Sequence, residues 1–256
     1  MSRTLERVLP PVLMLALLLF LFQVNTWLGL VPEYLLPSPA QVAAAFGQED
    51  VGFGSAFLES LTNAMTGFAM SVALGVSIAL LLSFSPRLER AFLPVSVFFQ
   101  TVPIIAIAPL LVIWFGFGAP TVRASAFVVS FFPILAGTLA GLSSAPPTRL
   151  ELFRALKATR LQTLWHLKIP QALPAFFTGL EIAVGLAVIG AVVGEFVAGS
   201  GLGSLIDVAR TQQRVDLVFA AVLLITLMGV AVLGAVKTLK WMLFRYRPFA
   251  LATEDS

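Results

Sequence analysis

The sequence predicts an all-α membrane protein with six transmembrane helices and both termini on the cytoplasmic side. Three observations lead to this fold class: an apolar composition, apolar stretches long enough to cross a bilayer, and a biased distribution of basic residues. Of the 256 residues, 59% are hydrophobic and only 11% are charged, whereas soluble domains carry about 25% charged residues. Mean hydropathy is +0.97. Most of the surface is therefore expected to face lipid.

Six apolar stretches match the length that a bilayer requires. A hydrocarbon core about 30 Å thick needs roughly 20 apolar residues per helix. The stretches are separated by polar or Gly/Pro-rich breaks and run over residues 9–29, 61–83, 92–115, 122–141, 175–198 and 217–239. Pro103 and Pro109 interrupt the third stretch, which a membrane tolerates beside a neighbouring helix or a polar cavity.

The basic residues indicate the orientation of these spans, because Lys and Arg concentrate on cytoplasmic connections. With a cytoplasmic N-terminus, only Arg123, Arg210 and Arg214 of the 16 Lys and Arg residues fall on outer segments, which leaves 13 inside. Both termini are therefore predicted to be inside. The net charge of +3 follows from this topology, and no nucleic-acid partner is expected. Because there is no cysteine and only one histidine, no metal site is predicted.

The chain is predicted to form a single transmembrane domain over residues 1–256, with two longer connections. The outer connection, residues 30–60, contains Ser38 and Gln41 in the spacing of a capping box, with Pro39 at the first helical position. That pattern predicts a short interfacial helix from Pro39 to about Phe46.

The inner connection, residues 143–174, is unusually basic for this chain. Thr148 and Glu151 have the spacing of a second capping box, which predicts a short helix from Arg149 to about Thr159. Charged side chains recur on this helix every three residues, at Glu151, Arg154, Lys157 and Arg160. Leucine and phenylalanine side chains supply its apolar side, so the helix is amphipathic.

This segment resembles the signature of ATP-binding-cassette (ABC) importer permeases, which reads Glu-Ala-Ala, three residues, Gly, nine residues, Ile-x-Leu-Pro. Glu151 falls on the Glu, Lys157 on the Gly and Pro170 on the Pro, without a gap. Lys157 is a departure from the pattern, since a residue with a Cβ adopts positive φ less easily than Gly. The run Ala158–Gln162 is similar to "Gly-Ala-Ser-Arg-x-Gln" of the nitrate, sulfonate and taurine branch. "LPSPAQV", "PIIAIAPLLVIWFGFG" and "VVGEFVAGSGLGSLI" are similar to segments of that branch too.

The resemblance implies a type I ABC importer permease fold and a set of partners. These are cytoplasmic ABC ATPase subunits, an external solute-binding protein, a second permease copy in a homodimer, and the lipid bilayer of the bacterial inner membrane. It also implies an ATPase-docking coupling helix formed by Glu151, Arg154, Lys157, Ala158, Thr159 and Arg160. ATP and Mg²⁺ would be used by the ATPase, because no Gly-x-x-x-x-Gly-Lys-Ser/Thr loop occurs here. This chain is then a transport subunit that binds no cofactor and is not an enzyme.

Four polar residues within the spans are candidates for the translocation pathway, since charged and polar groups in a span usually face protein or water. They are Gln100, Thr101, Glu181 and Glu195. For Glu195, the alternatives are interfacial solvation or a hydrogen bond to the following Gly-rich segment 199–205. That segment is predicted to be an outer reentrant turn or a helix break. For Glu181, the alternatives are a partner on another helix or snorkelling toward the cytoplasm.

Small residues spaced by four mark one face of the fifth span, at Gly179, Ala183, Ala187 and Ala191, and Gly190 and Gly194 form a second such pair. This spacing allows helix backbones to approach closely in lipid. It predicts tight packing within one subunit, and a dimer seam is the alternative.

Two classes of function are considered. The first is the permease subunit of an ATP-driven ABC importer, whose solute the branch resemblance places among nitrate, sulfonates, taurine and heterocyclic vitamin or pyrimidine precursors. The alternative is a secondary, ion-coupled transporter that uses Glu181 and Glu195 as titrating sites. Six spans without a visible inverted repeat argue against the alternative.

Overall fold

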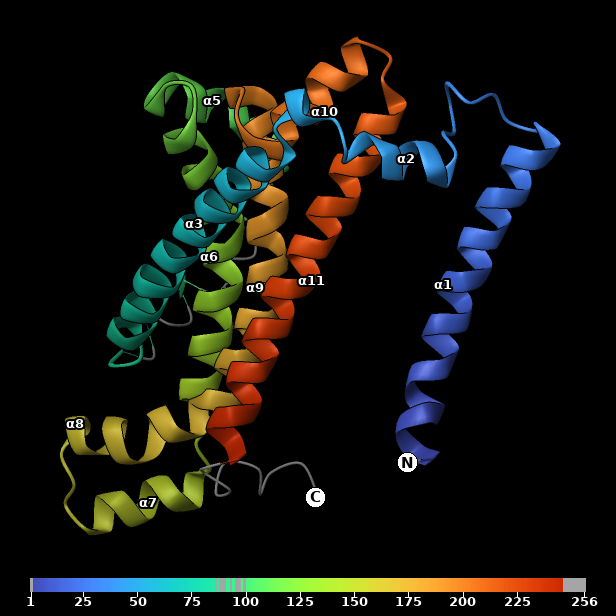
Figure 1. Ribbon diagram of the computed structural model, residues 1–256. Coiled ribbons are helices and arrows are strands. Elements are labelled where there is room, and N and C mark those ends of the chain that lie inside the picture. The colour runs from blue at the N-terminus through green and yellow to red at the C-terminus, as the bar shows by residue number, and fades with distance from the viewer. Residues whose placement is uncertain are drawn as a thin grey trace.

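The computed structural model describes residues 2–85, 87, 91–92, 94, 98 and 100–245, which form helices and connecting turns (Figure 1). The long helices are α1 (Ser2–Leu28), α3 (Phe53–Leu82), α6 (Ala119–Ser143), α9 (Ile169–Ala198) and α11 (Val215–Arg245). The shorter elements are α2 (Pro39–Ala45), the 3₁₀ turn η1 (Glu49–Val51), α5 (Ile104–Phe115), α7 (Pro147–Ala155), α8 (Arg160–Thr163), the π turn η2 (Leu164–Lys168) and α10 (Gly201–Thr211).

Four helical segments within the described residues are long and apolar enough to cross a membrane: α3, α6, α11 and the continuous run Arg160–Ala198. In the same order, these four segments cover the second, fourth, sixth and fifth predicted spans. Helix α1 covers the first predicted stretch. The described part of the third predicted span is mainly the 12-residue helix α5, because residues 93, 95–97 and 99 lie outside the described part. The count of six spans therefore stays a prediction.

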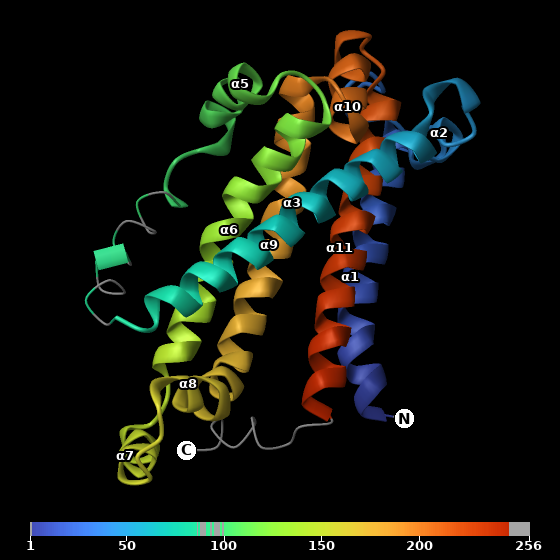
Figure 2. The ribbon, with the colours of Figure 1, turned by 90° about the vertical axis from the view of Figure 1, so that its left-hand side faces the viewer.

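The long helices α3, α6 and α9 pack against one another, and α11 runs beside α9 (Figures 1 and 2). Helix α1 stands at the edge of this bundle and is joined to it through α2 (Figure 1). The rings of Phe22 on α1 and Phe219 on α11 stack with centroids 6.0 Å apart. The predicted capping box of α2 is confirmed: the Ser38 hydroxyl accepts from the Gln41 N–H, and the Gln41 side chain accepts from the Ser38 N–H.

Helices α6 and α9 approach each other closely through small residues. A Cβ added to Gly179 would stand 2.7 Å from the carbonyl oxygen of Pro133, and one added to Gly190 would stand 2.5 Å from Cγ2 of Val129. The alanines of the same series of small residues spaced by four are also buried, namely Ala183, Ala187 and Ala191. Tight packing within one chain is thus confirmed. Because these small residues are buried within one chain, they are not exposed to form an interface between two copies.

Candidate functional site

The inner connection begins with α7, whose N-cap is Pro146 and which has no side-chain cap. The prediction that Thr148 caps this helix with Glu151 as its partner is therefore wrong. Pro147 has a fixed φ that suits the first helical position, so the helix starts before Thr148 and leaves it inside the first turn. The helix also ends at Ala155, about four residues earlier than predicted.

Lys157, which stands at the signature's Gly position, follows the end of α7 with a left-handed backbone, φ 54°. Its N–H donates to the carbonyl of Arg154 across 2.9 Å, and the N–H of Ala158 donates to the carbonyl of Phe153 across 2.9 Å. These two bonds form a Schellman motif, which usually places Gly at the left-handed position. The chain thus has a lysine in a backbone conformation that is usual for Gly. The left-handed conformation of a residue with a Cβ costs about 1–2 kcal/mol.

A capping box that was not predicted from the sequence starts α8. The Thr159 hydroxyl accepts from the Gln162 N–H across 3.2 Å, and the Gln162 side-chain oxygen accepts from the Thr159 N–H across 2.7 Å. Two residues of the predicted coupling set, Thr159 and Arg160, therefore set the start of a second helix. The segment is a helical hairpin, α7 followed by α8, rather than one helix.

The π turn η2 joins α8 to α9. In it, the N–H of Ile169 donates to the carbonyl of Leu164, five residues back. The next residue is Pro170, which has no N–H to donate and whose ring would clash with a carbonyl in normal α winding. The wider π winding gives that ring room. The hairpin is therefore continuous with the fifth span, from residue 160 to residue 198.

The α7–α8 hairpin projects beyond the long helices, at the end of the molecule opposite α10 (Figures 1 and 2). No residue of α7 is buried, although it carries leucines. We call the exposed apolar residues of this region the apolar docking face: Leu152 (56% exposed), Leu156 (70%), Leu161 (57%) and Trp165 (60%). The charged residues Glu151, Arg154, Lys157 and Arg160 of the same segment are exposed too.

The four pathway candidates do not form one site. Gln100 and Thr101 are exposed and lie directly before α5, where the Thr101 hydroxyl donates to the carbonyl of Phe98 across 2.7 Å. Glu181 and Glu195 are both on α9. They are 14 positions apart, and with a rise of 1.5 Å per residue they lie about 21 Å apart along the helix.

Glu181 has a partner on another helix, as one of the alternatives predicted. Its carboxylate forms an ion pair with Nζ of Lys240 on α11, across 2.9 Å, and both side chains are partly buried. The pair ties α9 to α11.

Glu195 is fully buried, and its Oε2 accepts a hydrogen bond from the N–H of Gly203 across 2.9 Å. The predicted alternative of a bond to the Gly-rich segment is thus confirmed. That segment is a helix break: α9 ends at Ala198 with Gly199 as its C-cap at φ 76°, and α10 begins at Gly201 with φ 64°. A Cβ at Gly203 would stand 2.7 Å from Cβ of Glu195, so glycine is what lets α10 approach the carboxylate.

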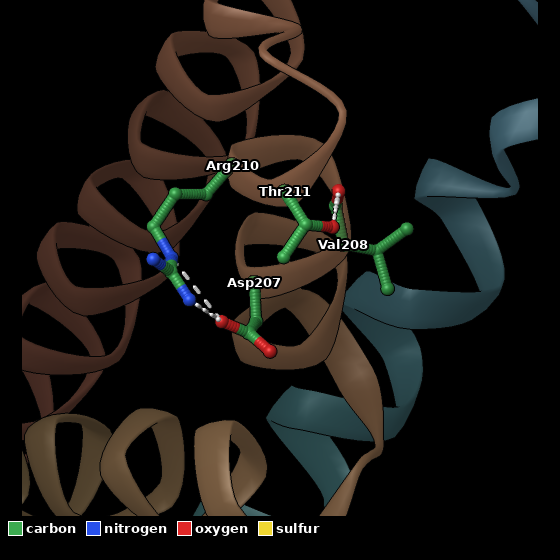
Figure 3. Close-up of polar contacts among 4 residues, drawn as sticks. All are labelled: Asp207, Val208, Arg210 and Thr211. Carbon is green, nitrogen blue, oxygen red and sulfur yellow. Dashed lines mark hydrogen bonds and ion pairs between the residues drawn. The ribbon is translucent and has the colours of Figure 1, made fainter.

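Helix α10 also carries charged residues on its outer surface. Asp207 and Arg210 form an exposed ion pair across 2.8 Å, and the Thr211 hydroxyl donates to the carbonyl of Val208 across 2.7 Å (Figure 3). On the opposite face, Leu202 and Ile206 are buried. The helix is therefore held by its apolar face and presents its polar face at the end of the bundle opposite the hairpin.

Three further polar residues with partners on another helix were not predicted as site residues. The Ser60 hydroxyl on α3 accepts from the N–H of Leu202 across 2.8 Å. Arg123 on α6 donates from Nε to Oδ1 of Asn63 across 2.9 Å. Ser60 and Asn63 are three residues apart and share a face of an apolar helix, and that pattern was the available signal.

The structure thus defines an all-helical, multi-pass membrane protein with an exposed helical hairpin at one end and a buried polar cluster at the other. Residues 71–240 match the family described as the binding-protein-dependent transport system inner membrane component, and the chain belongs to this family. It is therefore the permease subunit of an ABC importer, a multi-pass protein of the bacterial cytoplasmic membrane. Membership of this family excludes the alternative function, that of a secondary, ion-coupled transporter.

The relatives support the predicted branch. The formylaminopyrimidine transport permease of Halalkalibacterium halodurans is 37% identical over 241 residues, which cover 93% of this chain and 96% of that protein. The riboflavin transport permease of Chloroflexus aurantiacus is 35% identical over 240 residues, covering 92% and 89%. Relatives also include permeases for aliphatic sulfonates, taurine and nitrate.

The fold is that of a solved ABC importer. The chain matches a chain of the inward-facing MetNI methionine ABC transporter with a TM-score of 0.55 and 21% identity, covering 72% of this chain and 95% of that one. At this identity the likeness concerns the fold alone.

Proposed function

We propose that the α7–α8 hairpin is the coupling segment on which a cytoplasmic ABC ATPase subunit docks. The observation that carries the proposal is the apolar docking face, whose leucines and tryptophan are more than half exposed in the chain alone. An apolar patch rimmed by polar residues is typical of a protein–protein interface. The predicted set Glu151, Arg154, Lys157, Ala158, Thr159 and Arg160 would supply the polar rim.

The continuous helix from residue 160 to residue 198 would carry a displacement of the hairpin through the membrane. At its far end, Glu195 binds the start of α10, so α10 would move with α9. Closure of the ATPases would then favour one orientation of the permease over the other, which is the requirement of alternating access.

The proposed assembly contains two copies of this permease as a homodimer, two ATPases and an external solute-binding protein. Each copy would have six transmembrane helices with both termini in the cytoplasm. ATP and Mg²⁺ would be bound by the ATPases, and this chain would hold no cofactor or metal.

A nitrogen heterocycle is the solute that we propose. Two of the relatives are permeases for a formylaminopyrimidine and for riboflavin, at 37% and 35% identity. The permeases for taurine and aliphatic sulfonates are 30% identical. Among the pathway candidates, Gln100 and Thr101 are exposed, whereas the carboxylates of Glu181 and Glu195 bind groups on other helices. We therefore propose that Gln100 and Thr101 lie on the solute's route.

The docking proposal is tested by charge reversal on the hairpin. The double variant Arg154→Glu, Lys157→Glu should lose copurification with the ATPase and lose ATP-driven transport in proteoliposomes. The matched control reverses a cation at the opposite end, Arg210→Glu, and should retain ATPase binding. If the hairpin variant still assembles and transports, the coupling assignment is wrong.

The solute proposal needs the external binding protein, which can be identified by copurification with the permease. Calorimetric titration with a formylaminopyrimidine, riboflavin and taurine should give tight binding of a heterocycle only. Binding of taurine alone would contradict the proposal of a heterocyclic solute.

The proposed route of the solute can be tested separately. Because the chain has no cysteine, Gln100→Cys and Thr101→Cys can be labelled individually, and saturating solute should protect both from the label.

A further inference from the structure

A cavity of about 540 Å³ lies where the end of α3 meets the α7–α8 hairpin. Its lining includes Phe84, which follows α3, Arg154 on α7, and Arg160, Thr163 and Lys168 on the α8–η2 run. The volume falls in the range of about 300–1,000 Å³ that is typical of small-ligand sites. Three separate parts of the chain therefore enclose a space of ligand size outside the apolar docking face.

The charged side chains that line this cavity are all positive among the residues that the structure describes. Arg154, Arg160 and Lys168 line it, and no carboxylate does so among the described residues. The described ion pairs involve other cations, namely Arg210, Arg214 and Lys240. Three cations without an acidic partner in the described part of the chain would attract an anion, and the planar guanidinium groups match the oxygens of a phosphate.

The cavity also lies at the ends of two spanning helices, which is where a bilayer has its headgroups. One spanning helix ends at Leu82 and another begins at Ile169, directly beside the lining residues Phe84 and Lys168. Next to it, Leu81 and Phe84 are 68% and 42% exposed, so an apolar surface leads from the cavity toward the bilayer. Basic pockets between spanning helices on the cytoplasmic side are suited to the headgroups of anionic lipids.

We propose that this cavity binds the phosphate headgroup of an anionic phospholipid, with Arg160 and Lys168 as its main ligands and Arg154 closing it from α7. The lipid's acyl chains lie along the apolar end of α3. Because α3 and the coupling hairpin both contribute to the cavity, a bound lipid fixes the hairpin against the end of a second span. This site does not depend on the docking of the ATPase.

The test measures retention of phosphatidylglycerol by the purified full-length permease, without an ATPase, by native mass spectrometry. Wild type should retain phosphatidylglycerol and release phosphatidylcholine. In Arg160→Gln, Lys168→Gln the affinity for phosphatidylglycerol should fall by about 30-fold, the effect of removing two basic groups near an anionic headgroup. The conservative pair Arg160→Lys, Lys168→Arg should restore most of the binding, which separates charge from a folding defect.

The matched control is Arg149→Gln, Lys157→Gln, which removes two charges from the same connection but from residues that do not line the cavity. It should retain phosphatidylglycerol as wild type does. An equal loss in this control would show diffuse attraction to the membrane and overturn the site. Displacement of the lipid by millimolar inorganic phosphate would show a site for soluble phosphate and overturn the assignment to lipid. Either outcome leaves the docking proposal untouched, because no ATPase is present.

Discussion

The carboxylate of Glu195 on α9 accepts a hydrogen bond from the N–H of Gly203 in the first turn of α10. Beside it, Ser60 on α3 accepts from the N–H of Leu202. The first N–H groups of a helix have no partner within the helix, and here two of them are satisfied by side chains from two spanning helices. The N-cap residue Ser200 makes no such bond. Helix α10 is thereby fixed to α9 and α3 rather than being a free outer loop.

Replacing Glu195 by Ala should destabilise the protein by about 2 kcal/mol, because a buried donor left without an acceptor costs about 1–3 kcal/mol. Glu195→Gln should cost less, since its amide oxygen can still accept from Gly203. Thermal unfolding of the purified permease in detergent measures both. The control is Glu59→Ala, an exposed carboxylate on α3, which should change the midpoint little. Equal shifts in Glu195→Ala and Glu59→Ala would contradict this account.

Replacing Lys157 by Gly should stabilise the end of α7. The left-handed φ of Lys157 costs about 1–2 kcal/mol for a residue with a Cβ, and the greater freedom of Gly in the unfolded chain offsets part of that gain. Hydrogen exchange should show slower exchange of the Ala158 amide, which donates in the Schellman motif. Lys157→Ala keeps the strain and serves as the control. Faster exchange in the glycine variant than in the alanine variant would refute the assignment of strain.

Replacing Gly190 by Ala should separate α6 from α9. The added Cβ would stand 2.5 Å from Val129 and 2.7 Å from the carbonyl of Ser125, and overpacking of this kind costs roughly 1–3 kcal/mol. The matched control is Gly185→Ala on the same helix, where nothing lies within 4 Å of the added Cβ. The unfolding temperature should fall in the first variant only. A fall of similar size in both would point to helix propensity instead of packing.

Features that depend on neighbouring residues could be predicted from the sequence. The apolar stretches placed the long helices, Ser38 and Gln41 placed the start of α2, and the glycines of segment 199–205 placed the helix break. In each case the determining residues lie within one helical turn or one continuous stretch. Where two local signals competed, the prediction failed: Pro147 and Thr148 both favour a helix start, and the fixed φ of Pro147 prevailed.

Features that depend on distant residues could not be predicted. Ser60 and Glu195 are 135 positions apart in the chain, and nothing in their local sequence indicates that they meet at the same helix start. The ion pair of Glu181 was predicted only as one of several alternatives, because the sequence does not specify which helix lies beside α9. The left-handed backbone of Lys157 was missed for another reason: a lysine gives no signal for positive φ, and only the signature's Gly pointed to it.

The ion pair between Glu181 and Lys240 should contribute more to stability than the pair between Asp207 and Arg210. The first joins two helices, with side chains only 24% and 34% exposed, whereas the second lies within α10, with side chains 41% and 68% exposed. Exposed pairs contribute about 0.2–1 kcal/mol. A double-mutant cycle on Asp207→Asn and Arg210→Gln should therefore give a coupling free energy near the low end of that range. The cycle on Glu181→Gln and Lys240→Gln should give about 1 kcal/mol or more, measured by thermal unfolding in detergent. Because the pair ties α9 to α11, the exchange Glu181→Lys, Lys240→Glu should recover part of the stability lost in either single variant, and its failure to do so would show that the contact is incidental.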